Sequence, residues 1–297
     1  MASEADRRAA ILASLAGASV ELMPRDRAAV DHCIELVAPG TSVFISRVPG
    51  DAHGATVATA VLLREAGFDP VPHVGARYLE NPEAADDLLA RLVGEAGVTQ
   101  VLCIAGDVDR PAGPFAGSLD LIATGVFQKH GLGRVGIAGY PEGHPKIDDP
   151  ALVQGLDAKL ESLSDGGIEA FIVTQFCFDA APIVDFVRGL RARGIAVPIH
   201  IGVAGPASIA TLTKFAVRCG VGKSMRALIS GRGGMTRLLT DSGPETVVDA
   251  LAQARVGGTR LHFYTFGGVA KAGRWLAAVR SGAFTLTEDE AGFRLSR

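Results

Sequence analysis

The feature that most constrains the fold is a regular alternation of short apolar runs with segments of helical periodicity. Short apolar runs of this kind are typical of parallel strands that are buried on both faces. Eight of them in one domain-sized chain predict an α/β fold, a single (β/α)8 TIM barrel, whose active site lies at the C-terminal ends of the strands. The runs are Ser19–Leu22, Ser42–Ser46, Pro70–Val74, Gln100–Ala105, Arg134–Tyr140, Ala170–Gln175, Pro198–Val203 and Arg260–Phe266.

The segments between the runs carry helix start and stop signals. Asn81-Pro82 combines an N-cap with a proline at the first helical turn, and Gly67 ends an earlier helix. The connection between the seventh and eighth strands is enlarged, and such mouth-side loops usually build binding walls. The predicted helices are Arg27–Val37, Ala55–Ala66, Pro82–Val93, Ser118–Lys129, Pro150–Leu163 and Ala181–Arg193, with Ser208–Val217, Met225–Leu239 and Glu245–Ala254 in the enlarged connection.

Composition favours one compact domain over residues 1–297. The chain has 297 residues, of which 48% are hydrophobic, and a net charge of −3. This charge gives no electrostatic reason to expect nucleic acid or an anionic membrane as a partner. Residues 1–17 superficially resemble a signal peptide, but Glu4 and Asp6 precede the apolar stretch. We therefore expect an N-terminal helix that covers the bottom of the barrel.

Cysteine usage indicates a reducing compartment. The four cysteines are far apart and form no CxxC pair, so we expect buried thiols in a cytoplasmic protein. No stretch reaches the length of a membrane span.

Glu21 is the first candidate for chemistry, since it stands at the end of the first strand between Val20 and Leu22. Apolar neighbours at a barrel mouth would desolvate the carboxylate and raise its pKa, which would make it a general acid near neutrality. The alternative is an ion pair with a basic neighbour such as Arg25.

Further polar residues follow the fourth, fifth and sixth strands. Asp107 comes after Gly106, which would let a ligand approach the backbone; the alternative for Asp107 is a capping role. The loop 139–145 holds Tyr140 and His144 between two prolines and two glycines. Gln175 would aim an amide donor and acceptor at the mouth, which suits the edge of a heterocycle.

Four segments together resemble the methylenetetrahydrofolate reductase family. They are Gly139-Tyr-Pro-Glu-Gly-His-Pro, Val173-Thr-Gln-Phe-Cys-Phe-Asp, Ala105-Gly-Asp and His262-Phe-Tyr-Thr. They occur in the family's order on the expected strands, with a glutamate on the first strand, and the similarity spans essentially the whole chain. The resemblance implies reduction of 5,10-methylenetetrahydrofolate to 5-methyltetrahydrofolate, usually with FAD that is recharged by NADH or NADPH.

The resemblance also implies residue roles. Glu21 matches the general acid and Asp107 the aspartate near flavin and pterin, while Gln175 and Tyr264 are the expected substrate contacts. The expected cofactor contacts are Ser46, His73, Gly106, Tyr140 and His144. No metal site is expected, because His200 and His262 lack ligand spacing and a completing set, and they are expected in the core or facing the pterin.

The chain departs from the family's pattern at two places that bear on the identity of the cofactor. The helix before the sixth strand reads Leu160-Glu161-Ser162-Leu163 with only Lys159 nearby, where FAD-binding members carry Arg and Lys. Gly267-Gly268 replaces the family's Asn-Arg after the eighth strand. FAD is favoured, and the alternative is direct hydride transfer from NADH or NADPH. No regulatory domain is expected, a homo-oligomer is left open, and the competing functions are a pterin methyltransferase and a non-catalytic folate binder.

Overall fold

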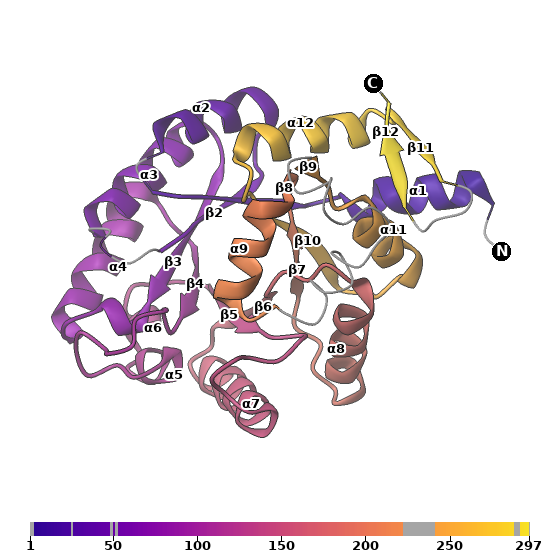
Figure 1. The fold of residues 1–297 in the computed structure, drawn as a ribbon. Helices are drawn as coiled ribbons and strands as arrows, with labels where there is room; N and C mark the ends of the chain where they lie inside the picture. The colour runs from indigo at the N-terminus through magenta and orange to yellow at the C-terminus, as the bar shows by residue number, and fades with distance from the viewer. Residues whose placement is uncertain are drawn as a thin grey trace.

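Eight parallel strands close into a barrel in the order β1-β10-β7-β6-β5-β4-β3-β2 (Figure 1), which confirms the predicted TIM barrel. The computed structural model describes residues 3–24, 26–47, 50, 53–221, 241–287 and 292–296. The barrel strands are β1 Ser19–Leu22, β2 Ser42–Ile45, β3 Asp69–Gly75, β4 Gln100–Ile104, β5 Arg134–Gly139, β6 Glu169–Thr174, β7 Ile199–Ala204 and β10 Thr259–Tyr264.

Helices surround the barrel and begin at recognisable caps. The Asn81 side chain accepts a hydrogen bond from the backbone of Ala84, and Asp148 does the same for Ala151. The described helices are α1 Glu4–Ser14, α2 Arg27–Leu36, α3 His53–Glu65, η1 Ala76–Tyr78 (a 3-10 turn), α4 Pro82–Ala96, α5 Ser118–Ile122, α6 Val126–Lys129, α7 Asp149–Asp165, α8 Ala180–Ala192, α9 Ile209–Cys219, α11 Glu245–Ala254 and α12 Val269–Arg280. Within the described ranges, none of these helices has the length and apolar character needed to cross a bilayer.

The structure corrects some predicted elements. The single helix expected over Ser118–Lys129 is two short helices, because Gly125 adopts a left-handed backbone with φ of 73° between them. The predicted helix Met225–Leu239 lies outside the described residues. Two small antiparallel pairs were not predicted, since their strands are only two or three residues long: β8 Ala207–Ser208 with β9 Asp241–Ser242, and β11 Phe284–Leu286 with β12 Phe293–Leu295.

An aromatic layer fills the barrel interior. The Phe44 ring lies 4.4 Å from the His262 ring, 5.8 Å from that of His200 and 6.0 Å from that of His73. Phe44 and Phe171 are fully buried and meet edge to face at 6.4 Å. Val71, Leu102 and Val173 complete this cluster. The barrel below the mouth is therefore a packed core, and the histidines lie within it.

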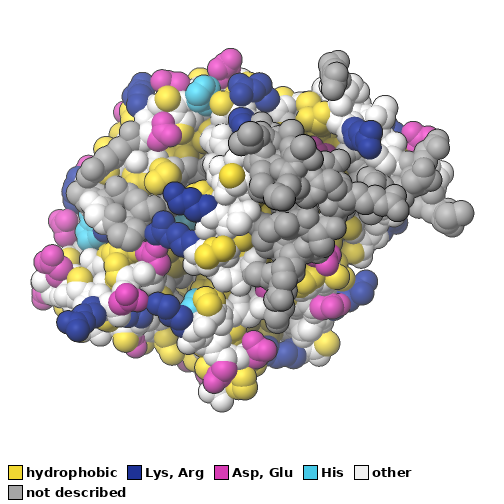
Figure 2. Space-filling model, viewed as in Figure 1, with side chains coloured by type: hydrophobic (Ala, Val, Ile, Leu, Met, Phe, Trp, Pro, Cys, Tyr) yellow, Lys and Arg dark blue, Asp and Glu magenta, His cyan; other side chains and the backbone are white. Residues whose placement is uncertain are grey.

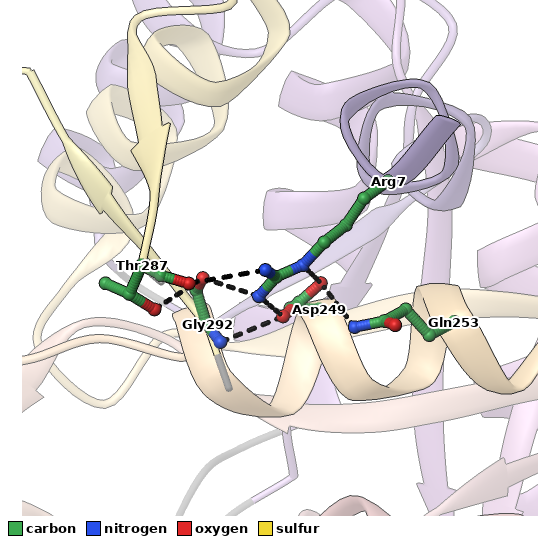
Figure 3. A network of polar contacts seen from close by, with 5 residues as sticks. All are labelled: Arg7, Asp249, Gln253, Thr287 and Gly292. Atoms are coloured by element: carbon green, nitrogen blue, oxygen red, sulfur yellow. Dashed lines mark hydrogen bonds and ion pairs between the residues drawn. The ribbon is translucent and has the colours of Figure 1, made fainter. Parts of the chain in front are cut away.

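The N-terminal helix α1 is fixed at the opposite end of the barrel. Ala13 and Ala16 line a cavity of about 70 Å³ together with Thr259, where β10 begins. In Figure 3, Arg7 of α1 forms a bidentate ion pair with Asp249 of α11. The same carboxylate accepts hydrogen bonds from the side chain of Gln253 and from the backbone N–H of Gly292. This network joins the first helix, α11 and the C-terminal hairpin.

Candidate functional site

Glu21 lies just inside the barrel mouth, where four adjacent strands surround it. The Ser46 hydroxyl, directly after β2, donates to its Oε1 at 2.6 Å. Its Oε2 lies 3.4 Å from Nε2 of His73 on β3 and 3.6 Å from Nε2 of His262 on β10. Ser19 lies two residues earlier on β1 and holds His262 by a 2.9 Å contact between its Oγ and Nδ1. The Glu21 side chain is 15% exposed.

The pKa of Glu21 corrects the expectation from sequence. Burial raises the pKa of this carboxyl, as expected from its apolar neighbours. The contact with His262, the charges of His73 and His262, and the hydrogen bond from Ser46 together outweigh burial and lower the pKa below its ordinary value. The carboxylate is therefore ionised in the ligand-free protein. The alternative partner, Arg25, lies outside the described residues.

His73 and His200 both have pKa values below the ordinary value of a histidine. Burial lowers the pKa of His73, with Glu21 opposing the effect only in part. Burial also lowers the pKa of His200, to about 3. His73, expected as a cofactor contact, is 8% exposed and touches Glu21 and Phe44. The structure thus places His73 beside the Glu21 carboxylate.

Asp107, after β4, is held at the rim by two side chains and does not cap a helix in this structure. The Tyr78 hydroxyl donates to its Oδ1, and Nη2 of Arg218 on α9 lies 2.5 Å from its Oδ2. Burial raises the pKa of Asp107, but the hydrogen bonds from Tyr78 and Arg218 lower it by more. The pKa therefore lies below its ordinary value. Its side chain is 48% exposed. Asp107 is therefore an ionised carboxylate within reach of solvent.

The glycine at position 106 makes room for a side chain of this chain, whereas room for a ligand was expected from the sequence. Its φ of 104° favours glycine, and a Cβ there would lie 2.7 Å from the Tyr78 ring. A Cβ at Gly75 would lie 2.4 Å from the same ring. The Arg47 guanidinium covers that ring at 4.6 Å. The close approach at Gly106 is therefore made by Tyr78 of this chain, which positions the hydroxyl on Asp107.

Gln175 and Tyr264 lie on the side of the mouth near β6 and β10. The Gln175 amide donates to the backbone carbonyl of Cys219, while its Oε1 is buried without a hydrogen-bond partner among the described residues. The Tyr264 hydroxyl donates to the carbonyl of Thr174 at 3.1 Å, and its ring stacks on Phe266 at 5.7 Å. Gln175 thus presents an unused acceptor, whereas Tyr264 forms part of the wall.

Tyr140 and His144 lie together on the loop after β5. Their rings meet edge to face at 5.1 Å, and burial raises the pKa of Tyr140. The Nδ1 of His144 accepts from the backbone N–H of Lys146 at 3.2 Å. Pro145 of this loop packs against Gly220, where a Cβ would lie only 2.6 Å from its ring. The loop therefore abuts the end of α9.

The last turn of α9 contacts two of the predicted site residues, Asp107 and Gln175. Burial raises the pKa of the Cys219 thiol, and the charges of both Glu21 and Asp107 raise it further. Gln175 binds the carbonyl of the same residue. Asp107 and Gln175 therefore both contact the last turn of α9, through Arg218 and Cys219 respectively. Cys219 is partly exposed, while the other three cysteines are buried as expected.

Sequence reasoning missed Tyr78 and Arg218, and it assigned no role beside Glu21 to His262. Tyr78 lies in the 3-10 turn after β3, where no motif marks it. Arg218 has the ordinary appearance of a basic residue in the last turn of a helix. His262 was visible as the first residue of the His262-Phe-Tyr-Thr segment, and its i, i+2 relation to Tyr264 on β10 was the available signal.

The residues of α7 do not fit the diphosphate of FAD. Within α7, all of which is described, Lys159 is the one cation, and burial lowers its pKa. Leu160 packs against the core and Leu163 is fully buried. The helix also carries four carboxylates, which would repel phosphate: Asp149, Asp157, Glu161 and Asp165. The cofactor implied by the resemblance therefore lacks its expected partners on this helix.

Comparison with known proteins supports the resemblance. The chain is 31% identical over 116 residues to methylenetetrahydrofolate reductase 2 of Saccharomyces cerevisiae, covering 36% of this chain and 19% of the relative. It is 31% identical over 136 residues to methylenetetrahydrofolate reductase 1 of Schizosaccharomyces pombe, covering 44% and 22%. It is 32% identical over 121 residues to methylenetetrahydrofolate reductase (NADH) 1 of Arabidopsis thaliana, covering 36% and 20%.

These matches span about a fifth of the length of the curated relatives. The sequence profile of the family described as methylenetetrahydrofolate reductase matches residues 33–270, a stretch that contains β2 to β10 of the barrel together with Asp107, Gln175 and Tyr264. With this match over most of its length, the chain belongs to the methylenetetrahydrofolate reductase family.

Proposed function

We propose that this barrel mouth reduces 5,10-methylenetetrahydrofolate to 5-methyltetrahydrofolate, with NADH or NADPH as the source of electrons. The proposal rests on the contacts that bring Asp107 and Gln175 to the last turn of α9, together with the Glu21 carboxylate inside the mouth of the same barrel. A proton donor, an anion and a two-sided amide are the groups that a reduced pterin with a bridging methylene requires at one site.

Glu21 is the proposed source of the proton. Opening the five-membered ring of the substrate requires a proton on the leaving nitrogen, which Glu21 would deliver directly or through a water. Because its pKa is lowered in the ligand-free protein, the carboxylate has to take up that proton when the folate binds. A pterin seated over Glu21 removes the remaining water from the carboxylate and moves its pKa upward.

Asp107 is the proposed electrostatic stabiliser. Ring opening leaves a cationic iminium, and an ionised carboxylate close to it lowers the energy of that intermediate. The lowered pKa of Asp107 keeps it ionised at neutral pH. The Gln175 amide would bind the pterin edge through its Nε2 and the acceptor Oε1 that has no partner.

The hydride source is the part of the proposal where family and chain differ. FAD is the cofactor that the resemblance implies, but the charges of α7 do not fit its diphosphate, and no step is assigned to it here. The shortage of cations on α7, where the half-buried Lys159 is the single one, favours the second candidate, direct hydride transfer from a reduced nicotinamide to the iminium. The visible spectrum of the purified protein tests whether FAD is bound, since a flavin gives an absorbance band in the visible range and a nicotinamide does not.

The reductase activity is tested by oxidation of NADH and NADPH in the presence of 5,10-methylenetetrahydrofolate. Glu21→Gln is expected to lower turnover by roughly 10²- to 10⁴-fold, the usual contribution of a general acid, and to retain folate binding. Glu161→Gln on the exposed face of α7 is the control and should match the wild type. Wild-type-like turnover in Glu21→Gln would remove the assigned role. Methyl transfer without NAD(P)H oxidation would instead indicate the methyltransferase alternative.

A further inference from the structure

The last turn of α9 occupies the centre of the proposed site. The helix runs across the barrel in the view of Figure 1, and it follows β7 and the short strand β8. Its residue Arg218 pairs with Asp107, and the next residue, Cys219, accepts a hydrogen bond from Gln175 through its carbonyl. Gly220 then ends the helix with a φ of 73°. One helical turn thus engages Asp107 and Gln175, two of the side chains assigned to the substrate.

These contacts have the chemistry of the ligand that the site is proposed to bind. The Arg218 guanidinium is a planar set of N–H donors on a carboxylate, as is the aminopyrimidine edge of a pterin. The Cys219 carbonyl is an acceptor for the Gln175 amide, as is the ring carbonyl of a pterin. The match is incomplete, because Oε1 of Gln175 stays buried and unpartnered. A pterin ring offers donor and acceptor together and would satisfy both halves of the amide.

Apolar packing holds α9 on the barrel, whereas the Arg218 side chain lies in contact with solvent. Leu212 and Ala216 are buried in an apolar cluster with Phe176, and the Phe215 ring stacks on Phe266 at 4.2 Å. The Arg218 and Asp107 side chains are 55% and 48% exposed, so solvent weakens their attraction. On the face shown in Figure 2, basic side chains lie beside carboxylates in contact with solvent. The helix is thus fixed by its apolar face, which includes Cys219, together with Val221 just beyond it, and the ion pair of Arg218 with Asp107 is its weakly held contact.

We propose that the last turn of α9 is an internal competitor for the pterin subsite: Arg218 and the Cys219 carbonyl occupy Asp107 and Gln175 until a folate displaces them. This inference rests on the proposed function. It predicts that removal of the Arg218 cation frees Asp107 and strengthens folate binding. If Arg218 instead bound the folate, its removal would weaken binding.

The test compares Arg218→Gln with Lys214→Gln in the full chain. Lys214 is an exposed cation on the same helix, so its replacement changes the net charge equally. Calorimetric titration with 5-methyltetrahydrofolate should show about two- to five-fold tighter binding for Arg218→Gln, the range expected for an exposed ion pair, and no change for Lys214→Gln. Without folate, amide hydrogen exchange over residues 209–219 should be faster in Arg218→Gln than in Lys214→Gln.

Equal or weaker folate binding by Arg218→Gln would overturn the inference, because Arg218 would then be neutral or a contact to the substrate. That result leaves the proposed function intact as long as the wild type binds the folate. Absence of folate binding by the wild type would defeat the proposed function, and the inference with it. The two failures are therefore distinguishable in one titration series.

Discussion

Two arginine–aspartate pairs lie at opposite ends of this barrel. They consist of the same two residue types but differ in the exposure of their side chains and in the other groups that donate to the carboxylate. At the bottom, Arg7 and Asp249 are 20% and 0% exposed, and Gln253 and the Gly292 backbone also donate to the carboxylate. At the mouth, the side chains of Arg218 and Asp107 are each about half exposed.

The difference separates a structural ion pair from an exchangeable one. A fully buried carboxylate without its cation is an uncompensated charge, so the bottom pair has to remain intact. An exposed carboxylate that loses its cation is solvated by water at little cost. The same two residue types therefore fix the fold at one end and leave room for a ligand at the other.

The largest expected effect comes from breaking the bottom pair. Asp249→Ala leaves the Arg7 guanidinium without its counter-charge and the Gly292 N–H without its acceptor (Figure 3), and it should lower the free energy of unfolding by about 3–5 kcal/mol. Urea unfolding followed by circular dichroism measures it. Replacing both members, Arg7→Met with Asp249→Leu, should recover part of the loss. A change below about 1 kcal/mol for Asp249→Ala would show that the two pairs do not differ as described.

A smaller effect is expected from the core between the two ends. His200 has a pKa lowered to about 3, because of burial and the charges of His262, Arg260 and Arg134. The unfolded chain binds this proton near pH 6.5 and the folded chain does not, so the stability is complete above pH 6.5 and falls as the pH drops towards 3. Between pH 7 and pH 5 the loss from His200 should be about 2 kcal/mol.

The variant His200→Gln isolates this term, because it removes the titrating group and keeps a polar side chain. Unfolding free energies at pH 7 and pH 5 should differ by about 2 kcal/mol less in the variant than in the wild type. Parallel pH curves for the two proteins would mean that His200 is not the acid-sensitive group of the core.

At the mouth, Gln175→Ala should weaken binding of 5-methyltetrahydrofolate about ten-fold, the loss expected for one hydrogen-bonding side chain in a ligand site. NADH binding should change less, because the amide is assigned to the pterin. Calorimetric titration with each ligand gives both values. Equal losses for the two ligands would remove the pterin contact from Gln175.

The smallest expected effect comes from breaking the mouth pair, Arg218 with Asp107. Asp107→Ala, in the same unfolding assay as Asp249→Ala, should change the free energy of unfolding by at most about 1 kcal/mol. Raising the salt concentration to 1 M should reduce even this difference, since salt screens exposed pairs more than buried ones. A loss as large as that of Asp249→Ala would place the mouth pair among the structural contacts.

Local periodicity was enough to predict the barrel and the position of its mouth, since each strand is a short, mostly apolar run. It also placed Glu21, Asp107 and Gln175 at strand ends. The pKa of Glu21 could not be predicted, because His73 and His262 reach it from strands distant in sequence. The engagement of Asp107 by Arg218, 111 residues away, likewise depends on how α9 folds back.

The aromatic layer around Phe44 has a consequence for access to the chemistry. Ser19 and His262 lie beneath Glu21, and Phe44 and Phe171 close the barrel axis at that depth. Within the described residues, packed side chains therefore separate Glu21 from solvent on the side away from the mouth. A folate bound as proposed would cover the remaining side, so that proton exchange between Glu21 and bulk water would slow while the ligand is bound.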